Sequence, residues 1–525
     1  MKSKALIISI LLIGFLCRIL FINQLPPSLN WDEVSHGYNA YSILKTGKDE
    51  WGISFPTIFR CFGDFKLPLY IYLSIPSIFI FGLNQFSIRL LSILAGTITP
   101  LIIYLILKKL TKPKSYIPYF GLLITSLSPG LIFLSRIALE ANLFMLLFCL
   151  SIYFLITKKY FWSSFIYGLS LFTYNSSRVL LPFYLVSLIY FIVSTKYNFK
   201  KSFYKFLPFI LFVGLATFQT LNQSGQARYQ WVSILDSGSI NRINELRQNY
   251  PRFIINKATY FIFTAGKNYL NHFNPKFIFF NGGSHYQFSI PNFYIISPLF
   301  IPFLLLGLIY ILKNIKQKEF QLILFFWLMS PLPSSITRDA PHILRSIIFI
   351  PFTITIISLG FIYLNQKHSK ISCLYLLITL LIGQYFFWPK YINYSKEYSS
   401  SWQYGYQQAV NFIKEKYNEY PQIVFTKRYG EAHEFVLFYW PWNPSVYQND
   451  KKIDWDYHAN WYWVNAFDKF KFVNDWEIKE KTQNINSKTL LITSPNNYNS
   501  KNSQLIKTIY FQNGKVAFEI VEINP

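Results

Sequence analysis

Long apolar runs recur through the first three quarters of the chain, and short polar segments separate them. A helical run of about 20 residues crosses a hydrocarbon core about 30 Å thick. Runs such as Ser297 to Leu312 do not alternate between apolar and polar residues, which argues against the strands of a membrane barrel. Since only helices and closed barrels satisfy the backbone in lipid, the pattern predicts an α-helical polytopic membrane protein.

Eleven spans are expected. The first run lacks a small-residue cleavage site and further spans follow it, so we expect a span and not a signal peptide. Leu69 to Leu83 is also apolar, but counting it would put Asp32 and the basic cluster near Lys108 on the same side. We interpret it as a helix that lies at the outer interface or dips into it, started by Pro68 and broken at Pro76. The spans lie near 5–22, 87–107, 116–133, 141–157, 161–176, 179–195, 206–222, 292–312, 320–331, 346–364 and 371–388.

The net charge of +26 is unevenly distributed. The first 388 residues hold 34 Lys and Arg against 10 Asp and Glu, whereas the tail holds 16 against 14. Basic clusters between spans indicate cytoplasmic loops, which puts the N-terminus inside and the tail outside the cell membrane. Nucleic-acid binding is a poor interpretation, because it needs one basic stripe and not six short loops. The clusters are Lys2/Lys4, Lys108 to Lys114, Lys158/Lys159, Lys196 to Lys205, Lys313 to Lys318 and Lys367/Lys370.

Acidic residues concentrate on the opposite face. Five of the ten acids before residue 389 lie between Asp32 and Asp64, and nine of the ten fall in loops predicted to be outside. A functional site on the outer face would give this pattern, although cytoplasmic loops too short to hold acids would give it as well. Carboxylates beside a bilayer suit proton abstraction or cation binding.

Several activities lack support in the sequence. The four cysteines form no disulfide framework and no C-x-x-C metal pair. There is no P-loop and no G-x-G-x-x-G, so a nucleotide site is unsupported and an activated substrate would arrive bound to lipid. No internal repeat is visible, which argues mildly against inverted-repeat transporters.

The tail, residues 389–525, predicts a small extracytoplasmic α/β domain after a transmembrane domain of residues 1–388, whose first outer loop is 23–86. Tyr406 to Tyr417 is expected to be helical. Strands are expected at Gln422 to Thr426, Phe435 to Tyr439 and Thr489 to Thr493, and a hairpin at Leu505 to Ile523 turning at Asn513-Gly514. Five tryptophans would bind sugar, sit at the headgroup layer, or form an ordinary core: Trp440, Trp442, Trp455, Trp461 and Trp463.

The first outer loop holds the strongest candidates. Asp32 and Glu33 follow a Pro-rich segment and precede a predicted amphipathic helix. A carboxylate here would take the proton of an attacking hydroxyl, but an N-cap with an acid in the first turn explains the same residues equally well. Lys66 would pair with a lipid phosphate; taken alone, a snorkelling anchor is the simpler interpretation.

Other outer loops add polar candidates. Arg136 and Glu140 would form an i,i+4 pair, or Glu140 would bind a metal or position substrate. Arg178, in a tight loop, would face headgroups or phosphate. His342 and Arg345, in a segment with a second Arg, suit a phosphate leaving group, because Arg offers bidentate contacts.

Taken together, these segments resemble the GT-C glycosyltransferases of the family 39 type, which include protein O-mannosyltransferases and the aminoarabinose transferase of lipid A. The resemblance is clearest over residues 25–182. It departs from the family at Leu67, where relatives have Pro, and at Glu140, where some have Asp. The matching segments are Asp32-Glu33, Lys66-Leu67-Pro68-Leu69-Tyr70, Arg89-Leu90-Leu91-Ser92 with Gly96, Ser128-Pro129, Ser135-Arg136, Glu140 and Pro341-His342-Ile343-Leu344-Arg345.

The resemblance implies an inverting transfer of a sugar from a polyprenyl-phosphate donor to an acceptor hydroxyl of a protein, glycan or lipid on the outer face. Asp32 would be the catalytic base, and Lys66 would contact the lipid phosphate. Arg136, Glu33 and Glu140 would bind substrate or, for the two acids, a divalent cation, which is the one cofactor considered. Arg178, His342 and Arg345 would complete the phosphate contacts.

Two alternatives stay open. A flippase or other carrier of lipid-linked oligosaccharide would need ionisable groups within the spans, where Arg18 is the clearest candidate. A glycan polymerase or ligase would use a pyrophosphate-linked oligosaccharide on the same face.

Overall fold

The computed structural model describes residues 2–195, 203–222, 231–459, 461–483, 485–499 and 501–525, so most of the basic cluster from Lys196 to Lys205 lies outside the described residues. The chain divides into two compact units. The helical unit comprises residues 1–20 and 92–389, and the loop–sheet unit comprises residues 21–91 and 390–525. The predicted boundary at residue 388 divides the chain into two consecutive segments. The two compact units are not consecutive, because residues 21–91 of the first loop belong with the tail.

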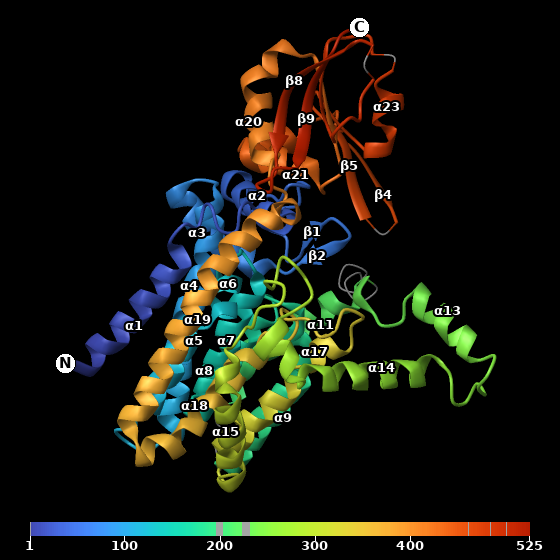
Figure 1. The fold of residues 1–525 in the computed structure, drawn as a ribbon. Coiled ribbons are helices and arrows are strands. Elements are labelled where there is room, and N and C mark those ends of the chain that lie inside the picture. The colour runs from blue at the N-terminus through green and yellow to red at the C-terminus, as the bar shows by residue number, and fades with distance from the viewer. Residues whose placement is uncertain (1, 196–202, 223–230, 460, 484, 500) are drawn as a thin grey trace. The chain divides into compact units, whose positions relative to one another are not determined.

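The helical unit is a bundle in which α15 packs on α18, α18 on α5, and α7 on α8 (Figure 1). Helices α4 and α19 begin or end in the loop–sheet unit. The elements are α1 Lys2–Ile19, α4 Gln85–Leu110, α5 Ile117–Leu127, α6 Pro129–Ser135, α7 Glu140–Ile156, α8 Tyr160–Ser170, α9 Asn175–Ser194, η1 Phe203–Phe206, α11 Leu207–Leu221, α13 Ser237–Leu246, α14 Lys257–His272, η2 Lys276–Asn281, η3 Pro298–Phe300, α15 Ile301–Lys313, α16 Lys318–Met329, α17 Leu332–Ser335, α18 Phe349–Lys367 and α19 Ser369–Glu397.

Each of the eleven predicted spans coincides with at least one helix of the described residues. By length and apolar composition, four of these helices suffice to cross a membrane (α4, α9, α18 and α19), or five if α5 and α6 form one span bent by 54°. The total of eleven therefore stays a prediction. The bend falls at Ser128-Pro129, where Pro129 cannot donate the backbone hydrogen bond that a continuous helix needs.

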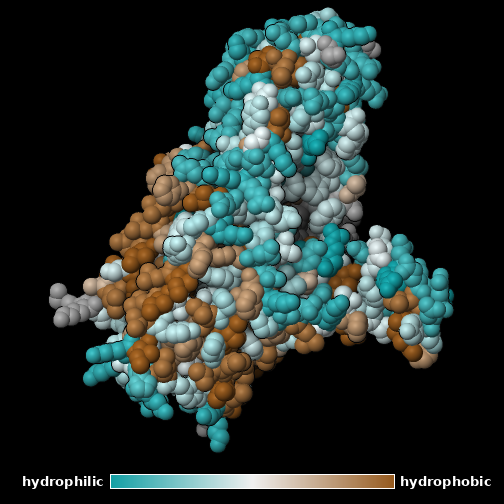
Figure 2. Space-filling view, viewed as in Figure 1, coloured by the Kyte–Doolittle hydropathy of each residue, from teal (hydrophilic) through white to brown (hydrophobic). Residues whose placement is uncertain are grey.

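Small residues allow the helices of this unit to approach closely. A Cβ added to Gly307 of α15 would lie 1.9 Å from the carbonyl oxygen of Ile356, and one added to Gly360 of α18 would lie 1.9 Å from that of Phe303. Such contacts are typical of helix packing in membranes. Outward faces carry exposed apolar side chains such as Phe218 of α11, and Figure 2 shows hydrophobic residues gathered over the surface of this unit. The surface suits a lipid environment.

The loop–sheet unit contains one mixed sheet, whose strands among the described residues run in the order β4-β5-β6-β3-β7-β9-β8 (Figure 1). Strand β3 is parallel to β6 and β7, and the other pairs are antiparallel. The elements are α2 Trp31–Thr46, β1 Phe59–Cys61, β2 Asp64–Lys66, α3 Pro68–Phe81, η4 Ser399–Trp402, α20 Tyr406–Lys416, η5 Tyr417–Glu419, β3 Gln422–Thr426, α21 Ala432–Tyr439, α22 Pro444–Gln448, β4 Asp454–His458, β5 Trp461–Phe467, β6 Phe470–Val473, η6 Asp475–Glu477, α23 Ile478–Lys481, β7 Thr489–Thr493, β8 Ser503–Tyr510 and β9 Val516–Ile523.

Most secondary-structure predictions for the tail are confirmed. The expected helix at Tyr406 and the strands at Gln422 and Thr489 are present, and the hairpin of β8 and β9 turns at Asn513-Gly514. Gly514 has a φ of 83°, which this turn requires and which glycine adopts without steric cost.

Two local predictions were wrong. The expected strand at Phe435 to Tyr439 belongs to helix α21, in which Ala432 to Phe438 are all buried. An uninterrupted buried run is compatible with a strand or a helix, and tertiary packing decides between them. The expected break at Pro76 is absent, because α3 continues from Pro68 to Phe81 with Pro76 inside it. Pro68 does begin this helix, at a position where its missing N–H has no intrahelical partner anyway.

Candidate functional site

Asp32 and Lys66 form an ion pair within the loop–sheet unit. Lys66 Nζ lies 2.5 Å from Asp32 Oδ1, and the side chains are 10% and 24% exposed, respectively. Asp32 lies in the first turn of α2, and Lys66 is the last residue of β2. A carboxylate that is a quarter exposed and held by an ammonium is accessible to a ligand and fixed in direction.

The start of α2 explains why the Asp32 side chain is available. Asn30, and not Asp32, caps this helix: Asn30 Oδ1 accepts from the backbone N–H of Glu33 at 3.0 Å. Glu33 Oε2 accepts in return from the N–H of Asn30 at 3.2 Å, which completes a capping box. The N-cap interpretation of Asp32 is therefore wrong, and its carboxylate is left to face Lys66.

Glu33 is buried and paired with Arg89, and its predicted contact with substrate stays a prediction. Its carboxylate is fully buried and accepts two hydrogen bonds from Arg89, from Nε at 2.8 Å and from Nη2 at 3.0 Å. Arg89 also donates to the carbonyl oxygens of Ile22 and Ser28, at 2.8 and 2.6 Å. A bidentate pair with further hydrogen bonds is the arrangement that makes a buried charge tolerable. This clamp fixes the segment that carries Asp32.

The hairpin of β1 and β2 brings Lys66 to α2. The hairpin turns at Phe62, whose carbonyl oxygen accepts from the N–H of Tyr462 in β5 at 3.1 Å. The Phe62 ring stacks on Trp461 with centroids 5.7 Å apart. The sheet of the tail thus supports the loop that carries Lys66.

The five tryptophans of the tail do not form one patch. Trp440 and Trp442 pack against each other at 5.0 Å and against Phe470, as part of an aromatic core. Trp461 instead contacts the first-loop residues. Trp455 packs on Trp51, 5.7 Å away, beside the guanidinium of Arg60.

In the helical unit, Arg136 is fully buried and has a structural position. Its Nη1 and Nη2 donate to the carbonyl oxygens of Cys17 and Leu20 at the end of α1, at 2.8 and 2.7 Å. Arg136 is the C-cap of α6 and Glu140 begins α7, so the two residues lie at the ends of successive helices, and their pairing stays a prediction.

Arg178, His342 and Arg345 are the residues of this unit predicted to contact the donor phosphate. They lie on two segments that a hydrogen bond joins. Ser176 donates to the carbonyl oxygen of Arg345 at 3.0 Å, which joins the first turn of α9 to the segment from Pro341 to Arg345. Arg345 Nη1 donates to Thr337 Oγ1 at 2.7 Å. A cavity of about 250 Å³ adjoins Pro341. Its other lining residues are Asn271, Asn274, Lys276, Phe277, Asn281, Gly282 and Ser284.

Arg178 points elsewhere. It donates to the carbonyl oxygen of Leu171 at 3.1 Å, to Gln219 Oε1 at 2.6 Å and to Thr220 Oγ1 at 3.1 Å, and so links α9 to α11. The predicted residues therefore fall into two sets. Asp32, Glu33 and Lys66 belong to the loop–sheet unit, and the remaining five belong to the helical unit.

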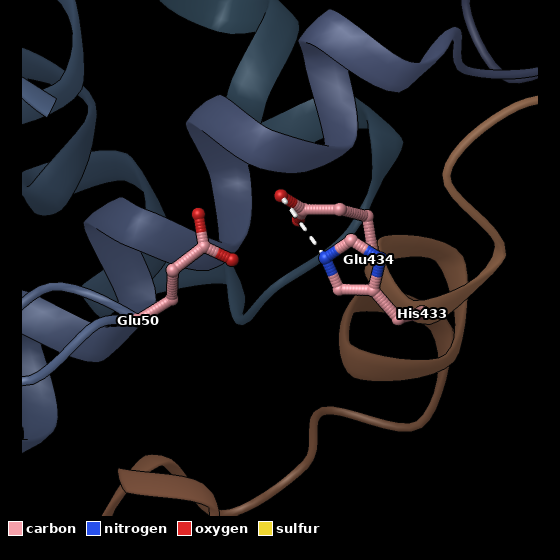
Figure 3. A group of neighbouring side chains, drawn as sticks. All are labelled: Glu50, His433 and Glu434. Atoms are coloured by element: carbon pink, nitrogen blue, oxygen red, sulfur yellow. Dashed lines mark ion pairs between the residues drawn. The ribbon is translucent and has the colours of Figure 1, made fainter. Parts of the chain in front are cut away.

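Sequence reasoning missed a third group, made by Glu50, His433 and Glu434 in the loop–sheet unit (Figure 3). The signal available was faint: adjacent acids at Asp49 and Glu50, and the run from Glu431 to Glu434, in a chain with few acids. Nothing in the sequence joins segments that lie more than 380 positions apart.

Comparisons with known proteins relate part of the chain to a protein family and its fold to solved structures. Residues 66–221 match the model of the family described as dolichyl-phosphate-mannose-protein mannosyltransferase. The fold is similar to that of ArnT from Cupriavidus metallidurans in the apo state, with a TM-score of 0.52, 9% identity, and coverage of 99% of this chain and 98% of that chain. The chain is thus similar to a mannosyltransferase family over residues 66–221 and to ArnT in its fold, in agreement with the resemblance seen in its sequence motifs.

Two further solved structures are similar to the chain. The crystal structure of the same ArnT bound to undecaprenyl phosphate gives a TM-score of 0.48 at 9% identity, with coverage of 99% and 98%. The oligosaccharyltransferase of Archaeoglobus fulgidus, in complex with Zn and sulfate, gives 0.48 at 12% identity. That match covers 83% of this chain but only 61% of the oligosaccharyltransferase, so the chain spans less than two thirds of that relative. A search of curated proteins found no match.

Proposed function

We propose that the protein transfers a sugar, with inversion, from a polyprenyl-phosphate donor to an acceptor hydroxyl on the outer face of the membrane. The observation that carries this proposal is the accessible ion pair of Asp32 and Lys66. The match of residues 66–221 to a family named for a lipid-phosphate donor supports the class of donor. ArnT, which shares the fold, was crystallised bound to undecaprenyl phosphate.

In the proposed reaction Asp32 is the general base. It takes the proton of the acceptor hydroxyl, the hydroxyl oxygen forms a bond to the anomeric carbon, and the bond from that carbon to the phosphate oxygen breaks. The lipid phosphate leaves with the bonding electron pair. Lys66, which neutralises Asp32 before substrate binds, would turn to the donor phosphate and compensate its charge as it leaves.

The clamp of Glu33 and Arg89 has a supporting role in this proposal. It holds the first turn of α2, so the direction of the Asp32 carboxylate is set before substrate binds. Arg178, His342 and Arg345 remain predicted contacts of the donor phosphate in the helical unit. The cavity that adjoins Pro341 favours a ligand near His342 and Arg345.

The test is Asp32→Asn in the full chain, reconstituted in vesicles with the lipid extract of producing cells. Loss of the base is expected to lower transfer by about 10²- to 10⁴-fold, because general-base catalysis contributes that much. Release of polyprenyl phosphate and mass spectrometry of the glycosylated products give the readout. Asp49→Asn removes a buried carboxylate elsewhere in the same unit and is the matched control, with transfer expected at the parent rate.

Transfer by Asp32→Asn at the parent rate would overturn the assignment of the base. Movement of labelled lipid across the vesicle membrane without any release of polyprenyl phosphate would instead identify a flippase.

A further inference from the structure

A second cluster of ionisable side chains lies in the loop–sheet unit, distinct from the pair of Asp32 and Lys66. Glu50 follows α2, and His433 and Glu434 lie in the first turn of α21. One nitrogen or oxygen atom from each lies within 4.8 Å of the others. Figure 3 shows the two carboxylates and the imidazole gathered around a common space.

The cluster is buried and lacks compensating charge. Glu50 and His433 are each 3% exposed, and Glu434 is 1% exposed. Among the described residues, neither Glu50 nor Glu434 forms an ion pair with Lys or Arg. Burying two neighbouring carboxylates costs several kcal/mol unless protons or a cation neutralise them.

The carboxylates are only partly satisfied by hydrogen bonds. Asn39 of α2 donates to Glu50 Oε1 at 2.9 Å, and the backbone N–H of Glu50 donates to Asn39 Oδ1 at 3.2 Å. Among the described residues, Glu50 Oε2 and Glu434 Oε2 are buried and accept no hydrogen bond from an N–H or hydroxyl donor, and the two carboxyl groups lie within hydrogen-bond reach of each other. Buried polar atoms of this kind are rare in folded proteins, and a cation bound between the two carboxylates would satisfy both oxygens.

The imidazole of His433 is oriented as in metal centres. Its Nδ1 lies 3.5 Å from Glu431 Oε2, and its Nε2 lies 4.0 Å from Glu434 Oε1. Trp461 Nε1 donates to Glu431 Oε1 and fixes that carboxylate. The Nε2 of His433 faces the carboxylate of Glu434 and would be the nitrogen that binds a metal. A carboxylate on the far ring nitrogen is the common outer partner of a metal-bound histidine.

We infer that Glu50, His433 and Glu434 bind a divalent cation, with Glu431 as the outer carboxylate that orients the imidazole. Zn²⁺ fits this set best, because it takes one nitrogen and two oxygen ligands at about 2.0–2.2 Å. Mg²⁺ and Ca²⁺ prefer oxygen alone. The cation would draw the three side chains closer and join the segment after α2 to α21.

The experiment uses the full chain purified in detergent, stripped with a chelator and then titrated with Zn²⁺ alone. After desalting, bound zinc is measured by inductively coupled plasma mass spectrometry. Thermal unfolding is followed in parallel. One Zn²⁺ per chain and a raised melting temperature are expected for the parent protein. Glu50→Gln and Glu434→Gln keep the shape of each side chain but remove its charge, and both are expected to lose the stoichiometric Zn²⁺.

Two further variants test whether the loss of Zn²⁺ is specific to the proposed ligands. Glu431→Gln is expected to weaken Zn²⁺ binding by roughly 10- to 100-fold, the effect typical of an outer partner. Asp49→Asn removes a buried carboxylate one residue from Glu50 and is expected to bind Zn²⁺ as the parent does. If the Gln variants do not fold, X-ray absorption of the Zn²⁺-loaded parent decides: nitrogen and oxygen ligands without sulfur support the site.

The inference is overturned if the parent takes up no stoichiometric Zn²⁺, or if Glu434→Gln binds Zn²⁺ as tightly as the parent. In the first case, a proton shared by Glu50 and Glu434 would account for the cluster. Because the readout is metal content, either outcome leaves the assignment of Asp32 untouched.

Discussion

The two units of the chain treat charge in opposite ways. The helical unit holds 29 Lys and Arg against 5 Asp and Glu, whereas the loop–sheet unit holds 21 against 19. In the helical unit, basic residues gather at helix ends and in the segments between helices, as at Lys108, Lys112 and Lys158. The loop–sheet unit buries acidic side chains next to particular partners: Glu33 next to Arg89, and Glu50 next to His433 and Glu434. Buried acids are costly, so their number in one unit points to where binding and chemistry are concentrated.

The units also differ in what holds them together. In the helical unit, helices pack through close backbone approaches at small residues such as Gly307. In the loop–sheet unit, one bidentate ion pair and its hydrogen bonds fix the start of α2. The ion pair is lost when one charge is removed, whereas the helix packing is lost when a side chain is added. The following substitutions test each kind of contact.

The largest effect is expected from breaking the clamp of the loop–sheet unit. Arg89→Met leaves the Glu33 carboxylate buried without its bidentate partner, which is expected to cost about 3–5 kcal/mol. Nine of the 13 tryptophans belong to this unit, so thermal unfolding followed by Trp fluorescence reports it. The control is Arg242→Met, which removes an exposed pair with Glu245 and is expected to cost less than about 1 kcal/mol.

A double variant sharpens this result. Replacing Glu33 and Arg89 together by Leu removes both charges, so the loss is expected to be smaller than that of Arg89→Met alone. Equal losses in the two proteins would mean that the pair is not what stabilises the loop.

The next effect concerns pH and the helical unit. Burial lowers the pKa of His272, in α14, from 6.5 to about 4, and its Nδ1 donates to the carbonyl oxygen of Asn268 at 2.8 Å. The unfolded chain binds this proton more readily, so stability is full above pH 6.5 and falls as the pH drops towards 4. At about 1.4 kcal/mol for each pKa unit, the loss is roughly 3 kcal/mol at most. Melting temperatures of the parent and His272→Gln between about pH 4 and pH 7 test this, since the variant should lack that part of the slope.

A smaller effect is expected from crowding two helices. Gly307→Ala places a Cβ against the backbone of α18, which cannot rotate away as a side chain can, and should cost about 1–3 kcal/mol. The melting temperature of the purified protein measures the loss. No change would show that α15 and α18 tolerate a wider separation than the structure gives them.

The smallest effect is expected where a glycine has free space. A Cβ at Gly266 of α14 would meet nothing within 4 Å, so Gly266→Ala should raise stability by up to about 1 kcal/mol through helix propensity. It is the matched control for Gly307→Ala, and a loss at Gly266 would indicate a neighbour of α14 other than those described.

The candidate site was only partly predictable from the sequence. Asp32 and Lys66 stand out because acids are scarce and because their segments resemble a known family, and the structure pairs them. Glu33 adjoins Asp32 and so suggests a ligand contact, but its partner Arg89 lies 56 positions away. The charge of Arg136 suggests a substrate contact, yet Arg136 donates to two backbone carbonyls. A charge can be located in a sequence, but its partner usually cannot.

The sequence by itself determined the apolar helices, the uneven charge, and the turn at Asn513-Gly514, because each depends on neighbours a few positions apart. Tertiary structure alone decided that α21 is a helix, that Glu33 is clamped, and that Glu50 meets His433 and Glu434. These outcomes depend on which distant segments exclude water from one another, and burial of that kind leaves no local pattern in the chain.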